Sequence, residues 1–176
     1  MYPIFRFAKE AIRIRRLGRL KPGEAHESRH LCWPWDVDPW MELNNGRTLT
    51  LFDLGRVALM IRCGVIPEMR RQGWGMAVAG ASIRYRRRVR MFHRLRMTST
   101  LVGWGERFFY VEQTMWRNGE AVSNAIFRLA MTDADGIAAP TRMARKLGWP
   151  ETSPKLPAHV TAWIEAEKAR PWPPER

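Results

Sequence analysis

The chain has 176 residues, 45% of them hydrophobic, which is enough for one domain with a substantial core and short appendages. No run reaches the roughly 18 apolar residues of a membrane span, and charges scattered through residues 1–20 leave no signal-peptide core. The net charge of +13, mostly from arginine, indicates an anionic partner. A phosphorylated small molecule, a nucleic acid, an acidic carrier protein and a membrane surface all fit.

Residues 1–20 are predicted to form a basic amphipathic helix. Ile4, Ala8, Ala11 and Ile12 follow helical spacing, with basic residues between them, and the pattern breaks after Leu20. Such a helix either makes peripheral contact with an anionic membrane surface or packs on the domain or a partner subunit. We therefore expect residues 1–24 to be an N-terminal extension.

A buried helix is predicted after a short strand and a polar loop. Residues 28–35 read as the strand, and residues 36–47 as the loop. Residues 48–63 are apolar on nearly every side, so this helix has to be enclosed, and Gly64 is a natural stop.

Four strands are predicted next, at residues 76–88, 94–104, 107–117 and 121–131. Asn118-Gly119 is a strong hairpin signal, and four sequential strands suggest an antiparallel meander. Wrapping that sheet around the apolar helix buries one face of the sheet and all of the helix. Short helices are expected at 140–149 and 158–170, before a Pro-rich end at 171–176. The sequence thus predicts an α+β domain over residues 25–150 and a C-terminal helix and tail over 151–176.

The loop carries a motif of spaced acids and paired asparagines before the helix. It consists of Asp36, Asp38, Leu43, Asn44, Asn45, Leu49, Asp53 and Arg56. With the order of elements, this motif resembles the hot-dog-fold thioesterases of the 4-hydroxybenzoyl-CoA thioesterase-like superfamily. The resemblance implies about five antiparallel strands wrapped around one long helix, and at least a homodimer. It implies hydrolysis of an acyl-CoA or acyl-carrier thioester without metal or cofactor, with Asp38 as nucleophile or general base.

The chain departs from the family where Met41-Glu42 replaces the Gly-His of many members. A catalytically weak or inactive hot-dog protein that binds acyl groups or CoA is therefore the first alternative. Glu42 beside Asp38 is a second candidate catalytic residue, because a pair of carboxylates in one cleft suits a base and an acid.

Helix N-termini present unpaired N–H groups that can polarise a thioester carbonyl. Gly46, Arg47 and Thr48 are the predicted oxyanion donors, and Asn44 or Asn45 the predicted helix cap and substrate contact. Trp40, with Trp33 and Trp35, is a candidate lining of an acyl pocket, although aromatic residues more often belong to a core.

Simpler structural roles compete with these assignments. Asp36 and Asp38 also suit turns, and Asp53 suits an ion pair with Arg56. His30 and Cys32 alternate onto one face, where packing is favoured over a Cys–His nucleophile. The two cysteines, Cys32 and Cys63, read as free thiols of a reducing compartment, in keeping with a cytoplasmic location. The four histidines lack metal-ligand spacing.

A basic run over residues 84–96 holds seven arginines and no acid. Arg86, Arg88 and Arg90 are candidates for binding CoA phosphates, and a carrier protein's acidic face or a solvated strand edge are alternatives. Nucleic-acid binding through this run is the second alternative function. It leaves the acid-rich loop unexplained, so the favoured interpretation has no nucleic-acid partner.

Overall fold

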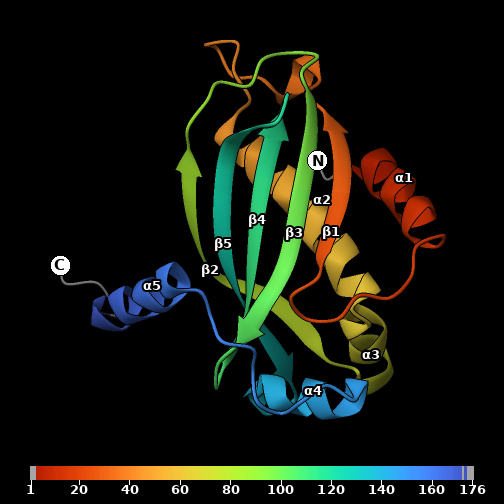
Figure 1. Cartoon of the computed structure of the whole chain (residues 1–176), viewed down its shortest axis with the longest axis vertical. Coiled ribbons are helices and arrows are strands. Elements are labelled where there is room, and N and C mark those ends of the chain that lie inside the picture. The colour runs from red at the N-terminus through yellow and green to blue at the C-terminus, as the bar shows by residue number, and fades with distance from the viewer. Residues whose placement is uncertain (1–2, 172, 174–176) are drawn as a thin grey trace.

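A computed structural model describes residues 3–171 and 173, and its core is a curled antiparallel sheet around one long helix (Figure 1). In chain order the elements are α1 (Ile4–Ile14), β1 (Ala25–Leu31), a 3-10 turn η1 (Pro34–Asp36), α2 (Asn45–Arg62), α3 (Val65–Gln72), β2 (Gly75–Tyr85), β3 (Arg94–Trp104), β4 (Phe108–Arg117), β5 (Glu120–Asp133), β6 (Gly136–Ala138), α4 (Pro140–Leu147) and α5 (Ala158–Ala169). The expected hot-dog fold is confirmed. Most of the expected Pro-rich tail lies outside the described residues.

The sheet has the order β1-β3-β4-β5-β2, with β6 pairing only with the end of β5. Strands β3, β4 and β5 form the expected meander, and the predicted turn at Asn118-Gly119 takes positive φ angles of 49° and 83°. The prediction of a four-strand meander is wrong for β2, which pairs with β5 at the far edge. The reason is that β1 occupies the free side of β3.

Helix α2 is enclosed as predicted. Leu51, Phe52 and Leu59 are fully buried against inward-facing residues of β3, β4 and β5, including Phe109 and Phe127. The helix starts at Asn45, three residues before the predicted start, and is followed by Gly64 with φ of 83°. The short helix α3 was not among the expected elements.

A polar network interrupts this apolar interface. The buried Gln113 side chain of β4 donates to the Phe52 carbonyl at 2.9 Å and to Ser99 Oγ at 2.8 Å. Arg56 donates to Gln113 at 3.3 Å and pairs with Asp53 at 2.6 Å, which confirms the structural interpretation of Asp53. Gly55 lies in the middle of this network, and an added Cβ would come within 2.9 Å of Ser99 Oγ.

The basic run crosses the end of the sheet, because residues 86–93 connect β2 at one edge with β3 on the other side of the meander (Figure 1). Strand β2 ends at Tyr85, three residues before the prediction, because the N–H groups of Arg86 and Arg87 turn to the Val122 carbonyl, at 2.9 and 3.1 Å. The Leu43 N–H donates to the Val89 carbonyl at 2.7 Å and ties this crossover to the polar loop.

Helix α1 packs on the domain through Phe7 and Ile14 and through a set of polar contacts. Glu10 is buried, and its carboxylate lies 3.1 Å from His26 Nε2 of β1 and 2.7 Å from Arg13 Nη1. Burial raises the pKa of Glu10, but the His26 hydrogen bond and the charge of Arg13 outweigh it and lower the pKa overall. Arg62 of α2 donates to His26 Nδ1 at 3.2 Å, so one buried histidine joins three elements.

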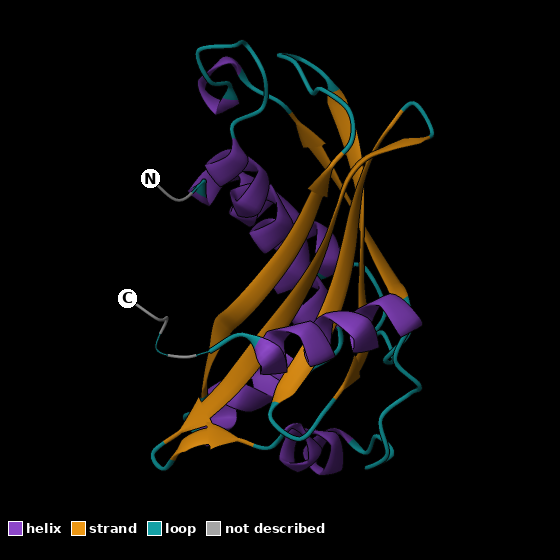
Figure 2. Cartoon of the chain, turned by 90° about the vertical axis from the view of Figure 1, so that its left-hand side faces the viewer, coloured by secondary structure: helices purple, strands orange, loops and turns teal. Residues whose placement is uncertain are grey.

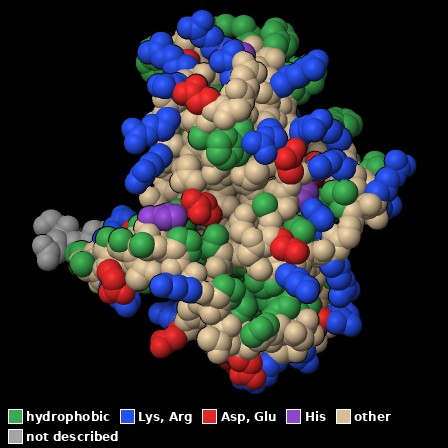
Figure 3. All heavy atoms as spheres, viewed as in Figure 1, with side chains coloured by type: hydrophobic (Ala, Val, Ile, Leu, Met, Phe, Trp, Pro, Cys, Tyr) green, Lys and Arg blue, Asp and Glu red, His purple; other side chains and the backbone are tan. Residues whose placement is uncertain are grey.

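Helix α5 lies across the outer face of the sheet (Figure 2). Its Val160 and Trp163 pack on Tyr110 and Ile126, whose neighbours along the strands, Phe109 and Phe127, point to α2. Lys and Arg side chains are spread over the face seen in Figure 3, with few acids among them. Among the described residues, no helix is both long and apolar enough to cross a bilayer.

Candidate active site

Asp38 closes the tight turn of the polar loop. Its Oδ1 accepts hydrogen bonds from the backbone N–H groups of Trp40 at 2.9 Å and Glu42 at 3.2 Å. Met41, in the middle of the turn, takes a positive φ of 59°, a backbone strain that the turn has to support. Asp38 is half-buried, so one carboxylate oxygen fixes the loop while the side chain lines the pocket described below.

Asp36, the first acid of the motif, is structural. It is buried, pairs with Arg6 of α1, and accepts from the Trp33 N–H at 2.9 Å. Its carbonyl accepts from the Asn44 N–H at 2.9 Å. Asp36 therefore fixes the base of the loop that carries Asp38.

Asn44 caps α2, as one of the two expected asparagines. Its Oδ1 accepts from the N–H groups of Gly46 at 2.8 Å and Arg47 at 3.4 Å, and its carbonyl accepts from the Thr48 N–H at 2.8 Å. The predicted oxyanion donors at positions 46–48 are thus occupied by the cap, and that prediction is corrected. Asn45, the first helical residue, has the N–H that neither the helix nor the cap uses in the described hydrogen bonds.

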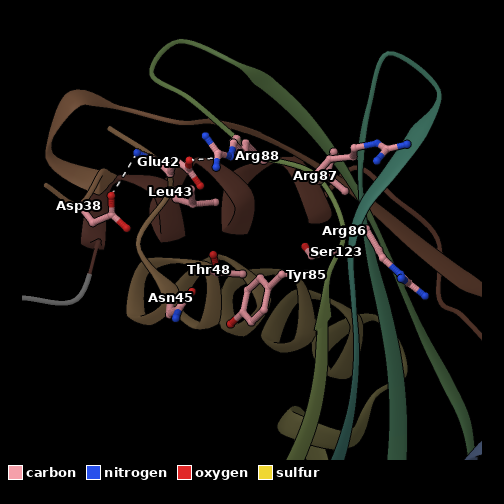
Figure 4. A pocket seen from close by; sticks show the side chains of 12 residues that line it. Asp38, Glu42, Leu43, Asn45, Thr48, Tyr85, Arg86, Arg87, Arg88 and Ser123 are labelled. Carbon is pink, nitrogen blue, oxygen red and sulfur yellow. Dashed lines mark hydrogen bonds and ion pairs between the residues drawn. The ribbon is translucent and has the colours of Figure 1, made fainter. Parts of the chain in front are cut away.

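A pocket of about 280 Å³ lies between the polar loop, the start of α2 and the basic crossover (Figure 4). Its lining brings together six of the predicted residues, Asp38, Glu42, Asn45, Thr48, Arg86 and Arg88. The other predicted residues do not line it: Trp40, Asn44, Gly46, Arg47 and Arg90. Trp40 is 79% exposed, because the turn at Asp38 directs it outward.

Glu42 and Arg88 form an ion pair across the mouth of this pocket. Arg88 Nε lies 3.0 Å from Glu42 Oε1, and both side chains come from above α2 in Figure 4. The Glu42 carboxylate is therefore paired with the Arg88 guanidinium in this structure. The Arg86 side chain runs away from Asp38 toward the outer face of the sheet, where it also lines a second cavity.

The pocket lining also includes two hydroxyl groups that the sequence did not single out, those of Tyr85 and Ser123. Tyr85 ends β2 with its ring over the start of α2, and Ser123 of β5 lies at the inner end (Figure 4). Ser123 Oγ is a buried side-chain polar atom without a hydrogen-bond partner among the described residues. A buried orphan hydroxyl costs free energy, which suggests that a ligand satisfies it. A serine in a strand gives no sequence signal of this kind.

The Cys–His interpretation fails on geometry and charge. Burial raises the pKa of the Cys32 thiol to about 11, and burial lowers the pKa of His30 to about 4. His30 Nε2 is hydrogen-bonded to Ser28 Oγ at 2.8 Å. Both cysteines are free and buried, and the described residues hold no group of three metal-ligating side chains.

The antiparallel sheet wrapped around α2 defines a hot-dog protein. The family model for the thioesterase-like superfamily matches residues 32–174, and the chain belongs to that superfamily. Protein THEM6 of Xenopus laevis is 28% identical over 143 residues, which are 80% of this chain and 67% of that protein.

Solved structures share the fold at low identity. The YbaW probable thioesterase of Escherichia coli superposes with a TM-score of 0.64 at 18% identity, over 69% of this chain and 94% of that one. The DHNA-CoA thioesterase of Staphylococcus aureus gives a TM-score of 0.63 at 11% identity, over 82% of this chain and 93% of that one.

Proposed function

We propose that the pocket at the start of α2 hydrolyses an acyl-CoA or acyl-carrier thioester, without a metal, with Asp38 as the catalytic carboxylate. The observation that carries this proposal is the convergence of three features on one cavity. These are the half-buried carboxylate of Asp38, the first N–H of α2 at Asn45, and the unpartnered hydroxyl of Ser123.

In the general-base route, Asp38 accepts a proton from a water molecule as its oxygen bonds to the thioester carbonyl carbon. The oxyanion that forms is stabilised by the Asn45 N–H and the positive end of α2. The C–S bond then breaks, and the thiolate of the carrier takes up a proton. In the nucleophile route, Asp38 itself bonds to the carbonyl carbon, the thiolate leaves, and water hydrolyses the mixed anhydride.

The carrier would lie over the basic crossover. Arg86 is exposed at the rim of the pocket and has no ion pair among the described residues, whereas Arg88 exchanges Glu42 for a phosphate when CoA binds. Charge-assisted bonds from guanidinium groups to phosphates are short and strong. An acidic carrier protein would meet the same cations.

Kinetics on a panel of acyl-CoA and acyl-carrier substrates test the proposal. Asp38→Asn keeps an oxygen that can accept from Trp40 and Glu42 but removes the basic carboxylate, so turnover should fall by about 100-fold or more at unchanged stability. Glu42→Gln is the matched control and should lose much less. Unchanged turnover in Asp38→Asn would sink the mechanism.

One observation favours the binding alternative. Two backbone N–H groups already occupy one oxygen of Asp38, as in an ordinary loop turn. A protein that binds acyl-CoA but turns over no substrate of the panel would support this reading.

The homodimer and the cytoplasmic location stay predictions. Strand β2 is at the edge of the sheet and, among the described residues, pairs on one side only, which leaves room for a second copy. Sedimentation of a single 20.6 kDa species would contradict the dimer.

A further inference from the structure

Helix α1 has apolar residues on two sides, because Phe7 and Ile14 pack toward the domain while Ile4, Phe5 and Ile12 face outward. Arg6, Glu10 and Arg13 face inward and bond to η1 and β1. Phe5 is 91% exposed and Ile12 is 60% exposed. A helix that packs on a soluble domain ordinarily buries its apolar stripe. Here a second, outward stripe of Ile4, Phe5 and Ile12 has no cover within the described residues.

The exposed stripe continues onto the neighbouring turn. The rings of Trp33 and Trp35 stack with centroids 5.2 Å apart, and Trp35 is 65% exposed. A groove of about 510 Å³ between α1 and the end of β1 is lined by Phe5, Trp33 and Trp35. We call the exposed apolar side chains the outer patch; they are Ile4, Phe5, Ile12, Trp33 and Trp35.

The charges around the outer patch select its partner. Lys9, Arg15, Arg16 and Arg19 are exposed on or just after α1. Glu10 is the only acid in residues 1–22, and it is buried. A second copy of a chain with net charge +13 would bring like charges together. A surface of anionic phospholipids supplies both opposite charge and an apolar interior, and aromatic side chains suit its interfacial layer.

We propose that the outer patch docks on an anionic lipid surface. Phe5, Ile12 and Trp35 enter the boundary between headgroups and acyl chains, and the flanking arginines contact lipid phosphates. The helix then lies on the membrane plane, and its inward face, with both polar and apolar contacts, holds the domain against that surface.

Cosedimentation of the full chain with vesicles tests this docking. The protein should bind vesicles of equal parts phosphatidylglycerol and phosphatidylcholine, and not vesicles of phosphatidylcholine alone. Phe5→Glu and Ile12→Glu should each weaken vesicle binding by about tenfold or more, since each removes an apolar side chain that docking would bury in the lipid. Neutralising Arg15, Arg16 and Arg19 to Gln should weaken binding by about 100-fold.

The controls separate docking from other events. Ile137→Glu changes an exposed isoleucine on β6, outside the patch, and should bind as the wild type does. Asp38→Asn should also bind normally, which separates docking from catalysis. Wild-type binding by Phe5→Glu and Ile12→Glu would mean adsorption by charge alone and would overturn the proposal. A smaller sedimenting species in these variants without vesicles would show that a second copy covers the patch, and would overturn it too.

Discussion

Arg6 of α1 and Asp36 of the polar loop form an ion pair across 30 residues of chain, with the Asp36 side chain almost wholly buried. Arg6 also donates to the Leu31 carbonyl at 3.1 Å, so one side chain joins α1 to β1 and η1. The N-terminal helix is thus part of what holds the loop that presents Asp38.

Replacing Arg6 with Ala should leave the buried Asp36 carboxylate without its main partner. We expect the free energy of unfolding to fall by about 2 to 3 kcal/mol, because the Trp33 N–H still compensates in part. Urea denaturation measures it. Lys9→Ala, which removes an exposed contact of the same helix to the Arg29 carbonyl, should cost less than about 1 kcal/mol. Equal losses in the two variants would contradict the role assigned to Asp36.

Ser123→Ala should separate function from stability. The hydroxyl has no partner in the absence of ligand, so its removal should leave the free energy of unfolding unchanged or raise it by up to about 1 kcal/mol. If substrate satisfies that hydroxyl, kcat/KM should fall by about tenfold. Thermal melts and steady-state kinetics on one preparation check both. A variant that is less stable and equally active would show that the hydroxyl serves the fold.

Arg86→Ala should raise the KM for acyl-CoA by about tenfold, since it removes a charge-assisted bond to phosphate. The same acyl group on pantetheine, which lacks the nucleotide, should show no change. Arg90→Ala is the matched control, because Arg90 belongs to the same basic run but does not line the pocket. Loss of affinity for both thioesters in Arg86→Ala would place the arginine near the acyl group instead.

Buried His30 should make the fold sensitive to acid. Its pKa is lowered to about 4 from 6.5, so the unfolded chain binds this proton at a higher pH than the folded one. Stability from this residue is present above about pH 6.5 and is lost progressively as the pH falls toward 4, by up to about 3 kcal/mol. Urea melts at neutral pH and at the acid end of this range measure it. His30→Gln should lose less stability between the two, and an identical loss would refute the assignment.

Much of the fold followed from sequence patterns. The apolar run of α2 and the apolar–polar alternation in β4 and β5 reflect burial directly, so these elements could be predicted from the sequence. Strand β1 was placed three residues late because its inward-facing residues, His26, Ser28 and His30, are polar and find their partners only in the folded chain. Helix α3 was missed because Pro67 and the flanking glycines resemble a loop.

The pocket was predictable only in part. Asp38, Asn45 and Arg88 belong to local motifs, and the fold brings them together. The prediction of oxyanion donors was wrong because the N–H groups of Gly46 and Arg47 donate to Asn44 Oδ1. That contact depends on the rotamer of the Asn44 side chain, which the sequence does not specify. Tyr85 and Ser123 reach the pocket from two paired strands, β2 and β5, so their meeting depends on sheet register.

The polar network around Gly55 sets the axial position of α2. An apolar helix against the apolar concave face of a sheet could slide along its axis by one turn, about 5.4 Å, with little change in buried contact area. The hydrogen bonds of Gln113 to Phe52 and Arg56 are directional and break on such a shift. These hydrogen bonds therefore fix α2 along its axis. Because Asn45 begins the same helix, they also fix its position relative to Asp38.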